Sequence, residues 1–105
     1  MAYESGALDS TLAAAAGDDP HLLAELRDAF VESAERQLDL LKRARCDGNW
    51  QVAAMRLKGL AASFNAEELL LAAENALVSA PGEPAAVRDI EMVIKRFNGT
   101  APQPF

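Results

Sequence analysis

The sequence predicts an all-α protein: an antiparallel up-down four-helix bundle with a short extra helix at the N-terminus. Composition is the first observation, because 22 Ala and 14 Leu stand against five Val, two Ile and two Thr. Ala and Leu lose little side-chain freedom in a helix, whereas β-branched residues lose more. The second observation is that apolar residues recur every three or four positions. The third is that the connections are short, which makes neighbouring helices antiparallel.

The 105 residues are expected to form one domain, with loose tails at 1–6 and 100–105. The net charge of −6 disfavours a nucleic-acid partner, because phosphate contacts need a basic face. The single cysteine, Cys46, excludes an internal disulfide framework and suits a reducing cytoplasm. The N-terminus lacks the pattern of a secretory signal, and no apolar run approaches the ~20 residues of a membrane span. We therefore expect a cytoplasmic protein without membrane association.

The first two predicted helices lie on either side of Gly17. A short helix is expected over 8–16, with Gly17 as its stop. A long helix follows over 20–45, with Asp19 as N-cap and Pro20 at its first position, whose N–H lacks a partner in any helix. One apolar stripe runs along this long helix and consists of Leu23, Leu26, Phe30, Ala34, Leu38, Leu41 and Ala44.

The next helix is predicted over 50–64. Asp47-Gly48-Asn49 is expected to end the long helix before it, and Asn65 after it tolerates a left-handed C-cap conformation. At about 100° per residue, one broad face of this helix is apolar and supplies the core. That face consists of Trp50, Ala53, Ala54, Leu57, Leu60, Ala61 and Phe64.

Two further helices complete the predicted bundle. One begins with Glu67 and Glu68, since acidic residues are favoured in a first turn, and ends before Ala80-Pro81-Gly82. The last spans 84–97 and is closed by Asn98-Gly99. Their core-facing residues are expected to be Leu69, Leu70, Ala73, Ala76 and Leu77 in the first, and Val87, Ile90, Ile94 and Phe97 in the second.

The side of the 50–64 helix opposite the predicted core carries Met55, Lys58, Gly59 and Ala62. Their spacing of i, i+3, i+4 and i+7 places them together. Gly59 costs the helix about 1 kcal/mol relative to Ala, and close approach of another surface is the usual reason for such a glycine. Met55 is an apolar side chain predicted to face solvent. On the helical wheel alone, a gap-filling or single surface methionine explains Met55 slightly better than a binding face.

The segment Met55-Arg56-Leu57-Lys58-Gly59-Leu60-Ala61 resembles the signature of histidine-containing phosphotransfer (HPt) domains, which reads His-x-Leu-Lys-Gly-x-Ala. The places of the family's later Gly-Ala and Leu are occupied by Phe64-Asn65-Ala66, with Asn instead of Gly, and by Leu69. Upstream, the family pattern is matched by Leu22-Leu23, Leu26 and Phe30 and by a Gly48-x-Trp50 turn. The resemblance covers about residues 8–80.

This resemblance implies the family's fold and docking surface, but not its phosphate chemistry. Family members carry phosphate on an exposed His, and Met55 occupies that phosphoacceptor-equivalent position. A thioether cannot accept and hold a phosphoryl group as imidazole does. In the family, a Lys helps to neutralise the phosphate and a Gly lets a receiver domain approach, and Lys58 and Gly59 keep those places. The expected docking residues are Met55, Lys58, Gly59 and Ala62, although Lys58 is alternatively only a solvated helix charge.

Other residues that carry chemistry fit structural roles better. His21, the only histidine, is either a displaced phosphoacceptor or a surface residue near a helix cap, and we favour the second interpretation. Cys46 is expected near a helix C-terminus, where the dipole disfavours a thiolate. Glu67, Glu68 and Glu74 lack an accompanying Glu-x-x-His pair and fit a solvated face. No zinc-ligand spacing or glycine-rich phosphate loop occurs, so we expect no metal, no cofactor and no enzyme activity.

The sequence therefore predicts a degenerate HPt-like module of a two-component phosphorelay. It is expected to bind a response-regulator receiver domain or a histidine kinase without passing phosphate, as a monomer or weak homodimer. Two other functions stay open. One is a structural bundle that self-associates through Met55, Gly59 and Ala62, and the other is a phosphotransfer protein that uses His21.

Overall fold

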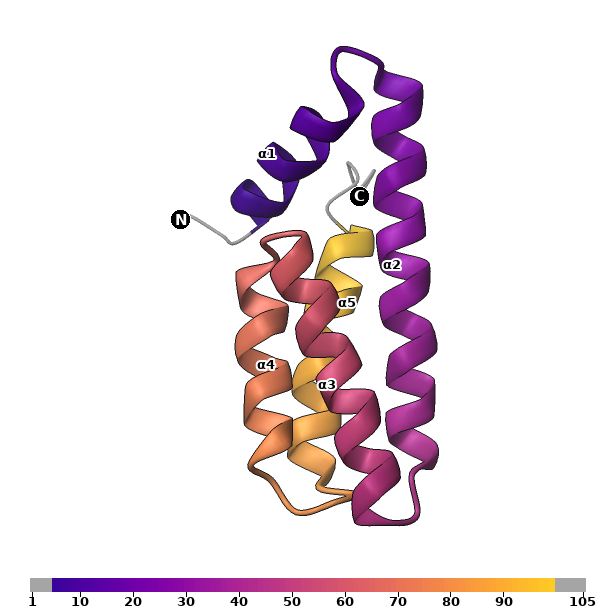
Figure 1. Cartoon of the computed structure of the whole chain (residues 1–105), viewed down its shortest axis with the longest axis vertical. Helices are drawn as coiled ribbons and strands as arrows, with labels where there is room; N and C mark the ends of the chain where they lie inside the picture. Colours follow the sequence, from indigo (N-terminus) through magenta and orange to yellow (C-terminus); the bar gives the residue numbers. More distant parts are fainter. Residues whose placement is uncertain (1–4, 100–105) are drawn as a thin grey trace.

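The computed structural model describes residues 5–99, and over this range the chain forms five helices and no strand (Figure 1). The helices are α1 (Ser5–Ala16), α2 (Pro20–Arg43), α3 (Asp47–Ser63), α4 (Glu67–Leu77) and α5 (Pro84–Gly99). The predicted all-α class is therefore confirmed. Among residues 5–99, no helix combines the length and the apolar character that crossing a membrane requires.

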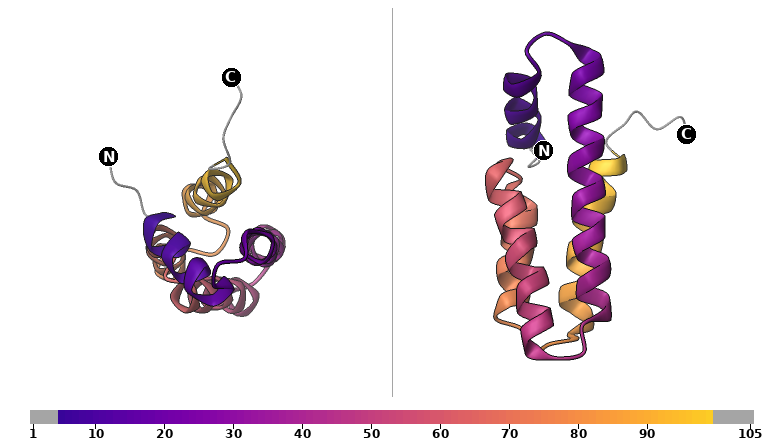
Figure 2. Two further views of the ribbon diagram at one scale, coloured as in Figure 1. Left: turned by 90° about the horizontal axis from the view of Figure 1, so that it is seen from above. Right: turned by 45° about the vertical axis from the view of Figure 1, so that its right-hand side comes forward.

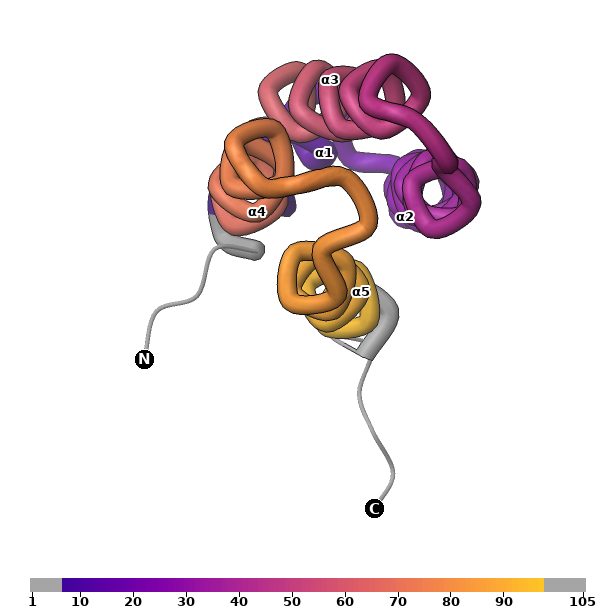
Figure 3. The backbone as a smooth tube through the Cα atoms, turned by 90° about the horizontal axis from the view of Figure 1, so that it is seen from below, coloured from indigo at the N-terminus to yellow at the C-terminus, as the bar shows by residue number. Residues whose placement is uncertain are grey.

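Four of the helices lie around a common centre, as the view along their axes shows (Figure 3). In this ring α2 and α4 each pack against both α3 and α5. Successive helices from α2 to α5 run in opposite directions (Figure 1). The fifth helix, α1, lies beside the start of α2 and over the end of the ring where α3 passes into α4 (Figure 2).

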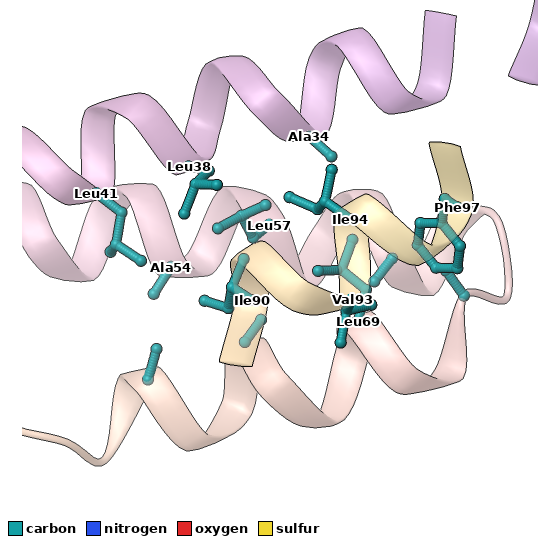
Figure 4. Close-up of a cluster of buried hydrophobic side chains, with 14 of the residues drawn as sticks. Ala34, Leu38, Leu41, Ala54, Leu57, Leu69, Ile90, Val93, Ile94 and Phe97 are labelled. Atoms are coloured by element: carbon teal, nitrogen blue, oxygen red, sulfur yellow. The ribbon is translucent and has the colours of Figure 1, made fainter. Parts of the chain in front are cut away.

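The core lies between these helices and contains mainly Leu, Ile, Phe and Ala side chains (Figure 4). Phe30 of α2 is 1% exposed, and its ring centroid lies 5.1 Å from that of Phe64 and 5.5 Å from that of Phe97. These three rings join α2, the end of α3 and α5. Leu8 and Leu12 of α1 are fully buried, so the short first helix also contributes to the core.

The predicted apolar stripes are confirmed as the sides that face the core. Every stripe residue is either buried or partly buried and packed against the buried cluster. The partly buried residues lie at the edges of the apolar stripes or near the helix ends. They are Leu23, Leu26, Ala44, Leu60, Phe64, Leu70, Leu77 and Val87.

The predicted caps are also confirmed. Asp19 Oδ1 accepts hydrogen bonds from the backbone N–H groups of His21, at 2.9 Å, and Leu22, at 3.3 Å, which satisfies two free donors at the start of α2. Gly17 has φ 68° and Asn65 has φ 58°, the left-handed conformation that ends a helix.

The predicted break at Asp47-Gly48-Asn49 was wrong. These residues form the first turn of α3, and the connection from α2 is shorter and earlier, over residues 44–46. Gly48 and Trp50 both lie within α3, so the segment Gly48-x-Trp50, expected to be a turn, is helical. The physical reason is that Asp47 is a favourable acidic residue in a first turn. In addition, the backbone N–H of Trp50 donates to the Cys46 carbonyl at 3.1 Å, which closes that turn.

Other helix ends also differ from prediction, and α2 ends at Arg43 instead of residue 45. Ser5 and Gly6, expected in a loose tail, belong to α1, and α5 continues through Asn98-Gly99 instead of closing before them. Asn and Gly are weak helix formers but do not forbid a last helical turn. The remaining parts of the predicted tails, residues 1–4 and 100–105, lie outside the described residues.

Candidate functional site

The rotation of α3 about its own axis is set near its N-terminus by Trp50. This side chain is 1% exposed, and its indole Nε1 donates to the carbonyl oxygen of Ala76 in α4 at 2.8 Å. A buried indole N–H needs such a partner, so the bond fixes how α3 and α4 face each other. The opposite side of α3 must then point away from the core.

The other end of α3 is also held in place. The Ala66 N–H donates to the Ala61 carbonyl at 2.8 Å, across the left-handed Asn65, which closes the helix in the manner of a Schellman motif. The Asn65 side-chain amide donates to Thr11 Oγ1 at 2.8 Å and so connects this turn to α1. With both ends fixed, α3 presents one defined face to solvent.

That outward face has an apolar centre. The Met55 side chain is 55% exposed, which confirms the prediction that it faces solvent. Val52, one turn earlier, is 48% exposed. Side chains of this kind are normal when isolated on a surface, but here two of them are adjacent on one helix face.

Gly59 and Ala62 continue the outward face, and because their side chains are absent or small this part of the surface is nearly flat. Both are exposed. A Cβ atom placed on Gly59 would meet no other heavy atom within 4 Å. Packing inside the protein therefore does not require glycine at this position, and nothing in the fold offsets its cost to the helix.

Lys58 lies on the flank of this face that borders α4. Its Nζ is 3.8 Å from Glu74 Oε2, and the two side chains are 42% and 46% exposed. An ion pair this exposed contributes little to stability. Lys58 thus has a partner in α4, and because both side chains are well exposed its ammonium group stays accessible to an acidic group from outside.

The opposite flank contains residues that the sequence did not single out. A shallow groove of about 390 Å³ runs between α2 and α3 and is lined by Leu40, Arg43, Ala44, Asn49, Val52, Ala53 and Arg56. Arg56 is exposed and has no ion-pair partner among residues 5–99. Val52 and Arg56 could have been found on the helical wheel, because both lie beside Met55. The α2 residues that line the groove could not have been found from the sequence, since their position beside α3 depends on how the helices pack.

His21 is exposed in the first turn of α2, at the end of the molecule that α1 covers. That end lies beyond the α3–α4 turn, so the structure does not bring His21 together with the outward face of α3 (Figure 1).

Cys46 is free and exposed, and it lies three residues beyond the last residue of α2, near that helix C-terminus as predicted. Because α3 begins at Asp47, Cys46 is its N-cap residue, with no side-chain capping bond. The positive end of the α3 dipole therefore opposes the effect of the α2 C-terminus that the sequence argument used.

The three glutamates considered as a possible carboxylate site do not act together. Glu68 pairs with Arg96 of α5, Glu74 pairs with Lys58, and Glu67 is exposed in the first turn of α4. In the described part of the chain, no group of three His, Cys, Asp or Glu side chains is arranged to hold a metal ion.

The outward side of α3 therefore combines an apolar centre, two small residues and two flanking cations. These are Met55 with Val52, Gly59 with Ala62, and Lys58 with Arg56. Comparison of the chain with protein-family models, with curated proteins and with solved structures found no match. The surface of α3 and its neighbours is the basis on which a function can be proposed.

Proposed function

We propose that the protein is an HPt-like signalling module that binds a response-regulator receiver domain, or a histidine kinase domain, without carrying phosphate. In this proposal α2 to α5 are the antiparallel up-down four-helix bundle of that family, α1 is the extra helix, and the module acts in the cytoplasm without enzyme activity. The observation that carries the proposal is Met55, 55% exposed in the middle of α3, at the acceptor position of an HPt-like segment.

The physical properties of the outward face suit protein docking. Met55 has a flexible and polarisable side chain that adapts to a partner's surface. Gly59 and Ala62 are exposed and small, so a partner backbone can approach α3 closely. Lys58 and Arg56 flank the centre, and the resemblance implies an acidic partner pocket, which these cations would attract.

The same face lacks the group that would carry phosphate. Met55 has no imidazole nitrogen to accept a phosphoryl group. His21, the chain's only histidine, lies on α2 at the far end of the molecule from the α2–α3 connection. A module of this kind would sequester its partner or compete with a working phosphotransfer protein.

Binding is tested by titrating purified receiver domains against the wild type and two variants of Gly59. Gly59→Gln should weaken binding at least about tenfold, or about 1.4 kcal/mol, because its side chain projects into the contact. Gly59→Ala is the matched control, since a methyl group at the same position leaves the surface nearly flat. Circular dichroism should show both variants to be fully helical.

The charge contribution is tested by Lys58→Glu. This variant should bind more weakly than the wild type, most clearly at low salt, where attraction is least screened. Lys95→Glu is the matched control, because Lys95 is exposed on α5, away from α3. If Gly59→Gln and Lys58→Glu both bind receivers as the wild type does, this face is not the interface. Self-association through Met55, Gly59 and Ala62 would then be the better explanation of the face.

Phosphate transfer provides an independent test. Incubation with a phosphorylated receiver should leave no acid-labile phosphate on the wild type, whereas Met55→His should become labelled, because it restores an exposed imidazole beside Lys58. Combining Met55→His with His21→Ala should leave that label in place. A stable phosphohistidine at His21 of the wild type would instead support the phosphotransfer function and contradict the degenerate one.

A further inference from the structure

The outward side of α2 carries a row of exposed residues spaced three or four apart, which places them on one face of the helix. This row, termed here the α2 stripe, consists of Leu22, Glu25, Ala29, Glu32, Arg36, Leu40 and Arg43. The opposite side of the same helix carries Phe30, Ala34, Leu38 and Leu41, which are buried in the core. Most of the α2 stripe therefore points away from the rest of the molecule, and Leu40 and Arg43 near its C-terminal end also line the groove between α2 and α3.

The charges on the α2 stripe are separated along the helix. Glu25 and Glu32 lie in its N-terminal half, and Arg36 and Arg43 lie in its C-terminal half. The helix dipole favours such an order only within the first and last turns, and Glu32 and Arg36 lie in the middle of a helix of 24 residues. The dipole therefore does not explain why the charges change sign there.

Ion pairing within the chain does not explain the charges either. Glu32 and Arg36 have the i, i+4 spacing of a helical ion pair, but the part of the chain that the structure describes contains no ion pair between them. Arg43 pairs only with Asp39, at 2.9 Å, and both side chains are more than half exposed. Three of the four stripe charges thus have no ion-pair partner among residues 5–99.

We propose that the α2 stripe binds a second copy of this chain, with the two α2 helices antiparallel. A two-fold axis at the level of residue 34 places Glu25 of one copy against Arg43 of the other and Glu32 against Arg36. Each pair occurs twice, because a two-fold interface is self-complementary. The same register brings Ala29 near Leu40 of the other copy, so a small residue meets an apolar one between the charged pairs.

The charge pattern of the α2 stripe favours a second copy of the chain over other partners. A uniformly acidic or uniformly basic partner would be attracted to one half of the α2 stripe and repelled by the other. A parallel arrangement of two copies would place like charges together. The contact is one helix wide, and small interfaces, below roughly 1,200 Å², belong to weak complexes, so the dimer is expected to be reversible and sensitive to salt. This inference does not rest on the proposed function, because it needs no receiver domain, although Leu40 and Arg43 of the α2 stripe also line the groove beside α3.

Sedimentation equilibrium of the full chain tests the proposal with two charge variants. Glu25→Arg/Glu32→Arg makes the α2 stripe entirely basic, and Arg36→Glu/Arg43→Glu makes it entirely acidic. Each variant alone should dimerise at least about tenfold more weakly than the wild type. An equimolar mixture of the two should associate at least as well as the wild type, because all four ion pairs are then restored.

A matched control separates the effect of the charges on the α2 stripe from the effect of the net charge of the chain. Arg88→Glu/Lys95→Glu changes the net charge by the same amount as the acidic stripe variant, on exposed residues of α5 that also lie seven positions apart. This control should dimerise as the wild type does, apart from a small general repulsion. Circular dichroism establishes that every variant is folded.

The outcomes are distinct. Dimerisation that weakens in each stripe variant, returns in their mixture and falls as salt shortens the screening length from about 30 Å to about 3 Å supports the proposal. A wild type that stays monomeric up to about 1 mM overturns it. A wild-type dimer that both stripe variants retain also overturns it, because the contact must then lie on another face.

Discussion

Replacing Gly59 by Ala should stabilise the protein by about 1 kcal/mol, the difference in helix propensity between these residues in a helix interior. Gly59 lies within α3, five residues before the C-cap Phe64. The added methyl group would meet no heavy atom within 4 Å, so no steric cost offsets the gain. Much of the effect arises in the unfolded chain, because Ala has less conformational freedom to lose on folding.

The matched control is Gly17→Ala. A Cβ on Gly17 would also meet nothing within 4 Å, but φ is 68° there, a conformation that costs an L-residue roughly 1–2 kcal/mol. The two substitutions add the same atom in equally open space, and only the backbone conformation differs. They should therefore shift the stability in opposite directions.

Thermal and urea denaturation, followed by circular dichroism, measure both effects. For a domain of this size, a change of 1 kcal/mol corresponds to about 4–8 °C in Tm. The dependence of the unfolding free energy on urea should keep its slope, since neither variant changes the surface that unfolding exposes. A Gly59→Ala variant that is no more stable than the wild type, or a Gly17→Ala variant that is more stable, would refute the reasoning.

Three further substitutions probe the remaining parts of the structure by the same denaturation measurements. Met55→Ala should change the free energy of unfolding by no more than about 0.5 kcal/mol, as exposed positions usually do, and a loss of several kcal/mol would place Met55 in the core. Trp50→Phe should lower it by about 0.5–1.5 kcal/mol, because the indole hydrogen bond is lost while the Ala76 carbonyl still accepts from the backbone N–H of Ser79 at 3.1 Å, and a neutral result would show that the indole bond does not form. Asp19→Ala should lower it by about 1 kcal/mol through loss of the N-cap, while Asp18→Ala, as its neighbour outside the cap, should have little effect.

The features that could be predicted from the sequence are those determined by local chemistry. The spacing of apolar residues identifies the inner side of each helix, because burial requires one continuous stripe. Asp19 and Asn65 mark helix ends through their own side-chain and backbone preferences. The exposure of Met55 follows from the same reasoning, since it lies opposite Trp50 and Leu57 on the helical wheel.

Features that depend on competition between signals, or on packing, could not be predicted in this way. Asp47-Gly48-Asn49 has the composition of a turn, and the sequence does not show that burial of Trp50 favours a helix starting earlier. The pairing of Lys58 with Glu74 joins two helices whose relative rotation depends on the Trp50 bond. The groove beside Arg56 exists only because α2 lies next to α3, which no residue of α3 specifies.

The burial of Trp50 has a consequence for optical experiments on this protein. Trp50 is the only tryptophan of the chain, it is 1% exposed, and its indole is bonded to α4. Its fluorescence should have the blue emission maximum of a dry environment and resist quenching by dissolved iodide. Because the indole lies on the inner side of α3, a ligand that settles on the outer side should leave the emission unchanged. Separation of α3 from α4 should move it to the red, so a single intrinsic chromophore distinguishes opening of the protein from occupation of its surface.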